Sequence, residues 1–321
     1  MKIGLMLTPY PNERWTLAKQ LGVTHAISRI PREQAAPPWD FMSLLLLKKS
    51  FDDAGLTLAC LEGDQIPMER IKLGLPGRDE DIEHFCQVLI NMGKVGIPML
   101  CYNFMAQFGW MRTSVTTRTR GGALVTSFDN DLVQEAPLTE AGLVTDERLW
   151  DNLIFFLQRV VPVAEKARVK LALHPDDPPI SPIRGVARII RSVDAFKRVI
   201  ETVPSDYNGI TFCQANSSAM GADVLETARY FAGRKKIFFI HFRNIIGDNA
   251  KFVETFHDEG QINMYEAMKC YLELGFDGLI RPDHAPTMEG EVNNVPGYEM
   301  LGRIFAVGYM KGLIEAISST R

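Results

Sequence analysis

The sequence predicts a (β/α)₈ barrel, and three observations lead to this fold class. Short apolar runs rich in β-forming residues alternate with longer amphipathic segments along the chain, which is the pattern of repeated βα units. Eight such runs occur in 321 residues, and eight strand–helix pairs over that length match a closed barrel. No linker rich in Gly, Ser or Pro interrupts the chain, so residues 1–321 are expected to form a single domain.

The predicted strands are the eight apolar runs. They comprise residues 3–9, 24–30, 56–62, 99–105, 169–175, 209–214, 237–244 and 278–284. Amphipathic helices are expected between them, for example over 150–167, 224–233 and 264–275. The second and third of these end in glycine, the residue preferred at a helix C-terminus. The apolar segment 302–317 is expected to form a last helix that closes the barrel; a dimer interface is the alternative, which leaves a homo-oligomer open.

A doubly wound open sheet is the alternative fold for alternating strands and helices. Such folds usually carry a Gly-rich phosphate-binding turn of the form GxGxxG after the first strand. The corresponding segment here, LTPYPNERW (7–15), has no glycine. The barrel is therefore the preferred prediction.

Residues 106–147 form a connection that is too long and too polar for an ordinary βα loop. Connections of this length in compact domains are usually lids or binding loops, or they lack regular structure. Because this one follows the fourth strand, in a barrel it would lie over the mouth where active sites form. We therefore expect a lid-like insertion over the active-site face, and a surface loop without a role is the alternative.

Composition excludes several classes of function. The formal charge is −4 and the pI is near 5.9, and Lys and Arg are scattered along the chain. The sequence therefore shows no basic segment of the kind that binds nucleic acid. No apolar run approaches the ~18 residues that cross a bilayer, and the initial MKIGLMLTPY reads as a first strand rather than a signal peptide. An odd number of widely spaced cysteines without a CxxC pair argues against disulfides. We therefore expect a cytoplasmic protein with no nucleic-acid or membrane partner.

Each of the last four apolar runs stops at a residue that can bind a metal: His174, Cys213, His241 and Asp283. The C-terminal ends of barrel strands converge on one pocket, so these side chains should meet there. Two imidazoles, a thiolate and a carboxylate suit zinc or iron and admit manganese, and ligands from four separate strands predict a catalytic ion with open positions. Taken singly, each His is as well explained as a hydrogen-bonded core residue and the Cys as a small apolar one, so the prediction depends on the joint pattern.

Two flanking segments fit the same site. In HPDDPP (174–179), Asp176 or Asp177 could accept a hydrogen bond from the imidazole of a metal ligand and set its tautomer; a solvated acidic turn is the alternative. In IHFRN (240–244), Arg243 lies two residues beyond His241 on the same face of its strand. Its guanidinium could form two hydrogen bonds to a substrate carboxylate, and a surface ion pair is the alternative.

The sequence resembles the mannonate dehydratase family, a metal-dependent group of xylose-isomerase-like barrels. The resemblance runs from about residue 1 to 317 and is carried by six segments in the family's order. They are LCYNFMAQFGWMRT (100–113), HPDDPP (174–179), NGITFC (208–213), IHFRN (240–244), RPDH (281–284) and PGYEMLGR (296–303). HPDDPP with RPDH and PGY downstream is a specific combination and not a common short pattern.

The resemblance implies a reaction and a set of site residues. The family converts D-mannonate to 2-keto-3-deoxy-D-gluconate with manganese or ferrous iron, and the implied ligands are the same His174, Cys213, His241 and Asp283. The His of RPDH and the Tyr of PGY are the implied acid/base pair, hence His284 and Tyr298. The reaction removes the C2 proton and expels the C3 hydroxyl, and the sequence does not assign which of the two residues is acid and which is base.

Substrate contacts are the least specified part of the prediction. Arg243, Arg112 and Asn103 are candidates for orienting the carboxylate and hydroxyls of a sugar acid. After RPDH the chain has Ala285-Pro286 where the family usually has Gly-His, so the exact sugar acid, like the metal and the pathway, is left open. A metal-dependent sugar isomerase or epimerase of the same superfamily is the alternative enzyme, although a Cys ligand favours the dehydratase. A non-catalytic sugar-acid binding protein is the alternative outside enzymes.

Overall fold

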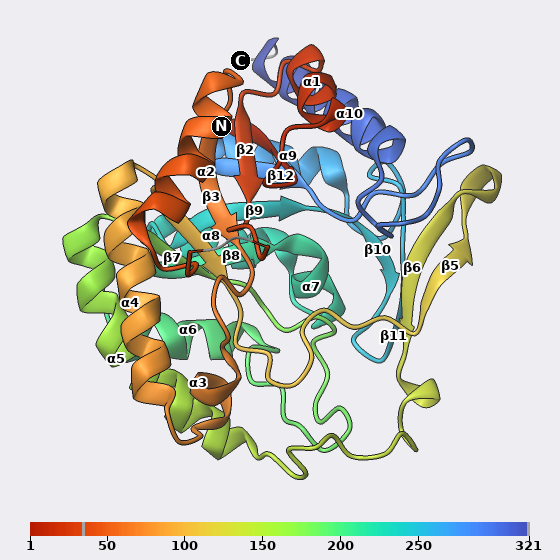
Figure 1. Cartoon of the computed structure of the whole chain (residues 1–321). Helices are drawn as coiled ribbons and strands as arrows, with labels where there is room; N and C mark the ends of the chain where they lie inside the picture. Colours follow the sequence, from red (N-terminus) through yellow and green to blue (C-terminus); the bar gives the residue numbers. More distant parts are fainter. Residues whose placement is uncertain (34–35, 320–321) are drawn as a thin grey trace.

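A closed barrel of eight parallel strands forms the centre of the computed structural model, which describes residues 1–33 and 36–319 (Figure 1). Each of the eight predicted runs overlaps one barrel strand, so the predicted fold class is confirmed. The strands are β1 (Lys2–Met6), β2 (His25–Ser28), β3 (Thr57–Glu62), β4 (Met99–Tyr102), β7 (Lys170–Leu173), β8 (Asn208–Cys213), β9 (Ile237–Phe242) and β12 (Leu279–Pro282). The last strand pairs with the first, since Lys2 lies in register with Leu279.

Helices alternate with these strands and lie around the outside of the barrel (Figure 1). They are α1 (Glu13–Gln20), α2 (Phe41–Asp53), α4 (Arg78–Val95), α5 (Asp146–Ala167), α6 (Val193–Thr202), α8 (Val224–Gly233), α9 (Met264–Glu273) and α10 (Met300–Ser319). Within the described part of the chain, none of the helices has the length and apolar character that a membrane span needs. Two short helices, α3 (Glu69–Leu73) and α7 (Gln214–Ala219), lie in the connections that follow barrel strands.

Capping residues decide where several helices begin and end. The side chain of Thr145 accepts a hydrogen bond from the backbone N–H of Arg148, so α5 begins four residues before the predicted range. At the end of α9, Gly275 takes the left-handed backbone conformation that a helix stop favours. At α8 the prediction that glycine ends the helix is wrong. Gly233 is still helical, and Lys235 takes the left-handed conformation instead.

The last helix closes the barrel, as the apolar segment 302–317 predicted. α10 packs against α9 and β12. Its Arg303 donates a hydrogen bond of 2.6 Å to the backbone carbonyl of Met6 at the end of β1. The helix therefore ties the last strand of the barrel to the first.

A second, antiparallel sheet stands beside the barrel and is called the accessory sheet here (Figure 1). The predicted insertion, residues 106–147, contributes the hairpin of β5 (Ser114–Arg118) and β6 (Leu124–Asp129). β6 pairs with β11 (Lys251–Glu254), which forms a hairpin with β10 (Ile245–Gly247) in the connection after β9. The insertion after the fourth strand is therefore present, but it forms a sheet with a distant loop.

The hairpin of β10 and β11 has a recognisable sequence pattern, although it was not among the predicted strands. Residues 245–254, IIGDNAKFVE, place a Gly-Asp-Asn turn between two apolar stretches, which is a common hairpin pattern. The pairing of this hairpin with residues 106–147 had no local signal. Phe128 of β6 and Phe252 of β11 pack together in a buried cluster, and this contact joins the two segments.

Phe156 of α5 provides a test of how the helices hold the barrel. Its ring is fully buried and lies 4.9 Å from the ring of Phe85 on α4 and 5.9 Å from that of Tyr102 at the end of β4. Phe156→Ala should lower the free energy of unfolding by ~3–5 kcal/mol because it leaves a cavity among these rings. Phe41→Ala, at a partly exposed ring on α2, is the matched control and should cost far less. Urea unfolding of both variants measures the difference, and equal midpoints would contradict the packing.

Candidate active site

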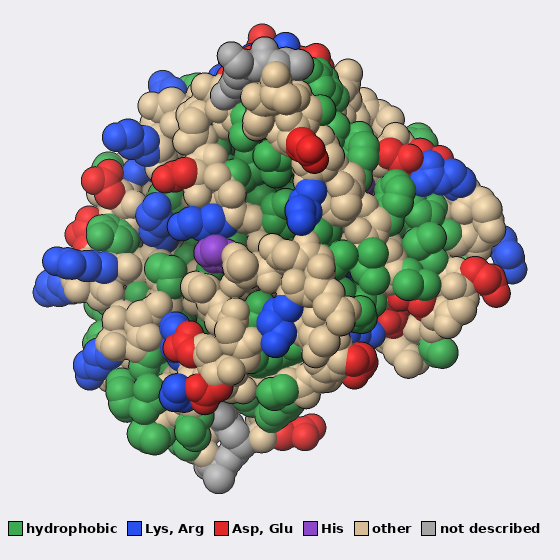
Figure 2. Space-filling model, turned by 90° about the horizontal axis from the view of Figure 1, so that it is seen from above, with side chains coloured by type: hydrophobic (Ala, Val, Ile, Leu, Met, Phe, Trp, Pro, Cys, Tyr) green, Lys and Arg blue, Asp and Glu red, His purple; other side chains and the backbone are tan. Residues whose placement is uncertain are grey.

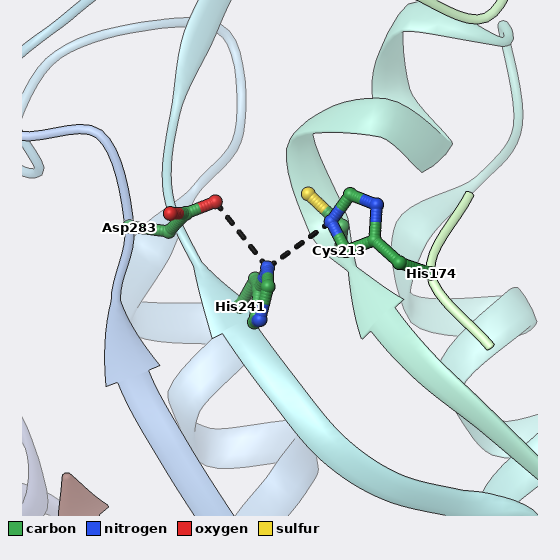
Figure 3. Close-up of side chains that lie close together, drawn as sticks. All are labelled: His174, Cys213, His241 and Asp283. Carbon is green, nitrogen blue, oxygen red and sulfur yellow. Dashed lines mark hydrogen bonds and ion pairs between the residues drawn. The ribbon is translucent and has the colours of Figure 1, made fainter. Parts of the chain in front are cut away.

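The four candidate metal ligands lie together at the C-terminal ends of consecutive barrel strands (Figure 3). One donor atom from each lies within 4.8 Å of the donor atoms of the others. His241 Nδ1 is 3.2 Å from His174 Nε2 and 3.3 Å from Asp283 Oδ2. The strand-end positions inferred from the sequence therefore converge in space, with donors supplied by β8 and β9 and by the residues that follow β7 and β12.

The chemistry of this donor set fits a divalent transition metal. Imidazole nitrogen, thiolate sulfur and carboxylate oxygen are all ligands for such ions. Burial alone would raise the pKa of the Cys213 thiol, but Arg243 and hydrogen bonds from His174 and His241 outweigh it and bring the pKa to about 6. The thiolate that a metal requires is therefore favoured. A second group that could hold an ion, Glu62, Cys101 and His241, shares one imidazole with the first.

Arg281 and Glu62 fix the orientation of two of these candidate ligands. Arg281 Nη1 lies 2.8 Å from Asp283 Oδ1, and its Nη2 lies 2.7 Å from Glu62 Oε1. Its Nε donates to His241 Nε2 over 3.2 Å. Burial would raise the pKa of Glu62, but Arg281 and His241 lower it to about 2, so the carboxylate stays charged. Neither residue was selected from the sequence, although Glu62 ends the third apolar run just as the selected ligands end later ones.

His284 and Tyr298, the pair implied by the resemblance, both approach Asp283. The Tyr298 hydroxyl donates to Asp283 Oδ1 over 3.1 Å, and His284 Nε2 lies 3.7 Å from the same oxygen. Burial and the nearby Asp283 raise the pKa of the Tyr298 phenol, so it keeps its proton. His284 has a φ of 45°, in the left-handed region that a non-glycine residue rarely occupies.

A pocket of about 130 Å³ opens beside this cluster. Its walls include His174, Asp283, His284, Tyr298, Asn103 and Trp110. The Asn103 side-chain carbonyl accepts hydrogen bonds of 3.1 Å from Lys72 Nζ and from the backbone N–H of Met105. The amide NH₂ of Asn103 is therefore the group left to donate to a ligand. Trp110 belongs to residues 106–147, so the predicted insertion does contribute to the pocket wall.

Arg112 and Arg243 are buried in ion pairs and are not among the residues that line this pocket. Arg112 Nη1 lies 2.6 Å from Asp177 Oδ1, and Arg243 Nη1 lies 2.7 Å from Asp177 Oδ2. Burial would raise the pKa of Asp177, but the two guanidiniums hold it far below its usual value. The surface ion pair considered for Arg243 is therefore wrong, because its side chain is only 1% exposed. Direct contact of either arginine with substrate stays a prediction.

The acidic turn after β7 is buried as well, which excludes the solvated alternative. Asp176 Oδ2 accepts a hydrogen bond of 2.7 Å from the backbone N–H of Ile190, and Asp177 binds the two arginines. In the described part of the chain, neither carboxylate hydrogen-bonds to the His174 ring. His174 Nδ1 instead lies 2.7 Å from the backbone carbonyl oxygen of Pro175. A backbone group thus takes the place that the sequence suggested for Asp176 or Asp177.

Glu254 is a further residue that the sequence did not single out. It ends β11 in the accessory sheet, and its Oε1 lies 2.7 Å from Arg112 Nη2 and 2.9 Å from His284 Nδ1. Nothing in its local sequence marks it, because its neighbours in space are distant along the chain. The accessory sheet therefore delivers a buried carboxylate to the site.

Comparison with known proteins places this arrangement in a family. The family model described as D-mannonate dehydratase (UxuA) matches residues 15–145 and 138–321. Mannonate dehydratase of Thermotoga maritima is 36% identical over 94% of this chain and 91% of its own length. The crystal structure of mannonate dehydratase from Streptococcus suis superposes with a TM-score of 0.92 at 30% identity, covering 100% of this chain and 95% of that one.

A more distant neighbour shares the fold alone. The xylose isomerase domain protein from Planctomyces limnophilus superposes with a TM-score of 0.64 at 15% identity, covering 99% of this chain and 98% of that one. It supports the barrel fold and says nothing of activity. The full-length matches at 30% identity and above go further and confirm the resemblance found in the sequence. The chain belongs to the mannonate dehydratase family.

Proposed function

We propose that the protein is a metal-dependent hydro-lyase that converts D-mannonate to 2-keto-3-deoxy-D-gluconate and water. The observation that carries this proposal is the convergence of four metal-binding side chains beside the pair His284 and Tyr298, in a chain that belongs to a dehydratase family. The ion that we propose is Mn²⁺ or Fe²⁺, as the resemblance to the mannonate dehydratase family implies, and the nitrogen, sulfur and oxygen donors of the site are compatible with either.

The residues proposed to hold the ion are His174, Cys213, His241 and Asp283. Bound there, a divalent ion would act as a Lewis acid that stabilises negative charge on the substrate carboxylate and an adjacent hydroxyl. Arg281 supports the site by holding both Asp283 and His241. A cation at this position would also balance the charge of the buried thiolate and carboxylate.

His284 and Tyr298 are proposed to move the two protons of the reaction. Burial and the nearby Asp283 raise the pKa of Tyr298, so its hydroxyl keeps a proton that it can give to the departing C3 hydroxyl. His284 is then the group that takes the C2 proton. Both side chains approach Asp283 Oδ1, which places them on the same side of the pocket. The enol product tautomerises to the keto acid and needs no further cofactor.

The pocket residues are proposed to orient the sugar acid and exclude water. The Asn103 amide NH₂ donates to a hydroxyl or carboxylate oxygen, and Trp110 covers the site, with its ring 5.1 Å from that of His284. Arg112 and Arg243 stay candidates for binding the substrate carboxylate, and both guanidiniums are paired with Asp177, which lines the pocket. Lys, Arg, Asp and Glu side chains are interspersed on the face shown in Figure 2, in keeping with a small-molecule substrate rather than a polyanion.

A panel of hexonates tests the reaction and the substrate together. With Mn²⁺ or Fe²⁺ present, D-mannonate should yield a 2-keto-3-deoxy acid, detected by product analysis, and other hexonates should react more slowly. An isomerised or epimerised sugar as the product would favour the alternative enzyme. Binding of D-mannonate without turnover would instead indicate a sugar-acid sensor.

Substitution of His284 separates catalysis from metal binding. His284→Asn should lower kcat by ~10²–10⁴-fold because a positioned base is lost, while metal content measured by elemental analysis stays at the wild-type level. His25→Asn is the matched control, since His25 begins β2 and so lies at the opposite end of the barrel. Unchanged turnover in His284→Asn would remove this residue from the mechanism.

Substitution of Cys213 tests the metal site itself. Cys213→Ser should weaken metal binding because a thiolate donor is replaced by a poorer one. Loss of a residue that only supports a metal ligand already lowers metal affinity by ~10–100-fold, and loss of a ligand should cost at least as much. Cys86→Ser on α4 is the control and should bind metal as the wild type does. Chelation should abolish wild-type turnover, and added Mn²⁺ should restore it. Retention of metal by Cys213→Ser after dialysis would contradict the ligand assignment.

A further inference from the structure

Glu254 lies against the imidazole of His284 although it comes from the accessory sheet and not from a barrel strand. Its Oε1 is 2.9 Å from His284 Nδ1 and 2.7 Å from Arg112 Nη2, and its side chain is 1% exposed. Burial would raise the pKa of this carboxyl, but Arg243 and His284 outweigh it and hold the pKa below its usual value. A charged acceptor therefore faces one nitrogen of the residue that the proposed function uses for proton transfer.

His284 Nδ1 has three neighbours that favour opposite tautomers: the carboxylate oxygen Glu254 Oε1 and two guanidinium nitrogens, of which Arg112 Nη2 is the more distant at 3.5 Å. Glu254 Oε1 can only accept a hydrogen bond, whereas Arg243 Nη1, also 2.9 Å away, can only donate one. Arg243 Nη1 donates to Asp177 Oδ2 over 2.7 Å and has Asp283 Oδ2 as an ion-pair partner at 3.5 Å. Arg112 Nη2 donates to Asp177 Oδ2 and to Glu254 Oε1. A lone pair on Nδ1 would instead be repelled by the Glu254 carboxylate. The arrangement thus favours a proton on Nδ1, donated to Glu254.

A proton on Nδ1 leaves the lone pair on Nε2 of His284. Nε2 lies 3.7 Å from Asp283 Oδ1, the oxygen to which Tyr298 donates, and His284 lines the pocket. The basic nitrogen is therefore on the side of the ring that faces the metal ligands and the acid candidate. The left-handed backbone of His284 is an unfavourable conformation that persists only where surrounding contacts hold it. Glu254 supplies one of these contacts.

We infer that Glu254 is a positioning residue for the dehydration: it fixes the Nδ1–H tautomer and the ring orientation of His284, so that Nε2 can take the C2 proton. This inference rests on the role of His284 in the proposed function. Glu254 is not among the residues that line the pocket, so its effect should fall on kcat and not on substrate binding. The accessory sheet then supplies a group that the reaction needs, although none of its described strands lines the pocket.

The tautomer can be read directly in the wild-type protein. Two-bond ¹H–¹⁵N spectra of ¹⁵N-histidine-labelled protein loaded with Zn²⁺, a diamagnetic ion, show which ring nitrogen carries the proton when the imidazole is neutral. The chain has six histidines, and the signal that disappears in His284→Asn identifies this residue. We expect the proton on Nδ1. A neutral ring protonated on Nε2 would overturn the inference, and this measurement requires no variant of Glu254.

Kinetics of Glu254 variants give an independent test. In Glu254→Ala, kcat for D-mannonate should fall by ~10²-fold or more because the base is no longer oriented, while KM and metal content stay close to wild type. Glu254→Asp keeps a carboxylate and should recover part of the loss. Glu259→Ala is the matched control, since it removes a carboxylate near β11 that pairs with Arg120 instead. Its kcat should equal that of the wild type.

The outcomes separate this inference from the proposed function. Wild-type kcat in a folded Glu254→Ala protein would overturn the positioning role even where dehydration itself is observed. A loss of metal or a rise in KM that accounts for the whole effect would also overturn it, because either would indicate a structural role. Absence of dehydration by the wild-type protein would instead contradict the proposed function.

Discussion

A buried network of ion pairs at the mouth of the barrel is the constraint on which the rest of the site depends. Its members are the carboxylates Glu62, Asp177, Glu254 and Asp283 and the guanidiniums Arg112, Arg243 and Arg281. Removing such charges from water costs several kcal/mol for each ion, and this cost is offset only when every charge has a partner at close range. Loss of one partner would leave a buried charge uncompensated, so the network fixes the positions of all its members together.

This constraint explains why the accessory sheet lies beside the site. Arg112 arrives from the insertion after β4 and Glu254 from the hairpin after β9, and the two meet because β6 pairs with β11. The Arg112 guanidinium carbon also lies 4.7 Å from the ring centroids of Trp110 and Phe252, so two aromatic rings make cation–π contacts with it. The insertion is thus part of the charge balance of the site as well as one of its walls.

The barrel itself supplies geometry that many enzymes share. One fold can host many unrelated reactions, so the fold does not determine the reaction. A neighbour at 15% identity shares the fold alone. The proposed reaction depends on the set of side chains at the strand ends: a thiol and two imidazoles near Asp283, with the phenol of Tyr298 donating to that same carboxylate. The rigid strands place these groups, and the buried charges behind them hold their orientation.

The sequence by itself determined the barrel strands and the candidate metal-binding set, because both depend on local patterns of apolar and polar residues. An apolar run indicates a buried strand, and the polar residue at its end lies at the mouth of the barrel. His174 and Cys213 could be chosen on this basis. Only the tertiary structure decided the partners: Arg112 pairs with Asp177, and Glu254 contacts His284, 30 residues further along the chain. Such contacts depend on barrel closure and on the pairing of two distant hairpins, and no local pattern of apolar and polar residues carries that information.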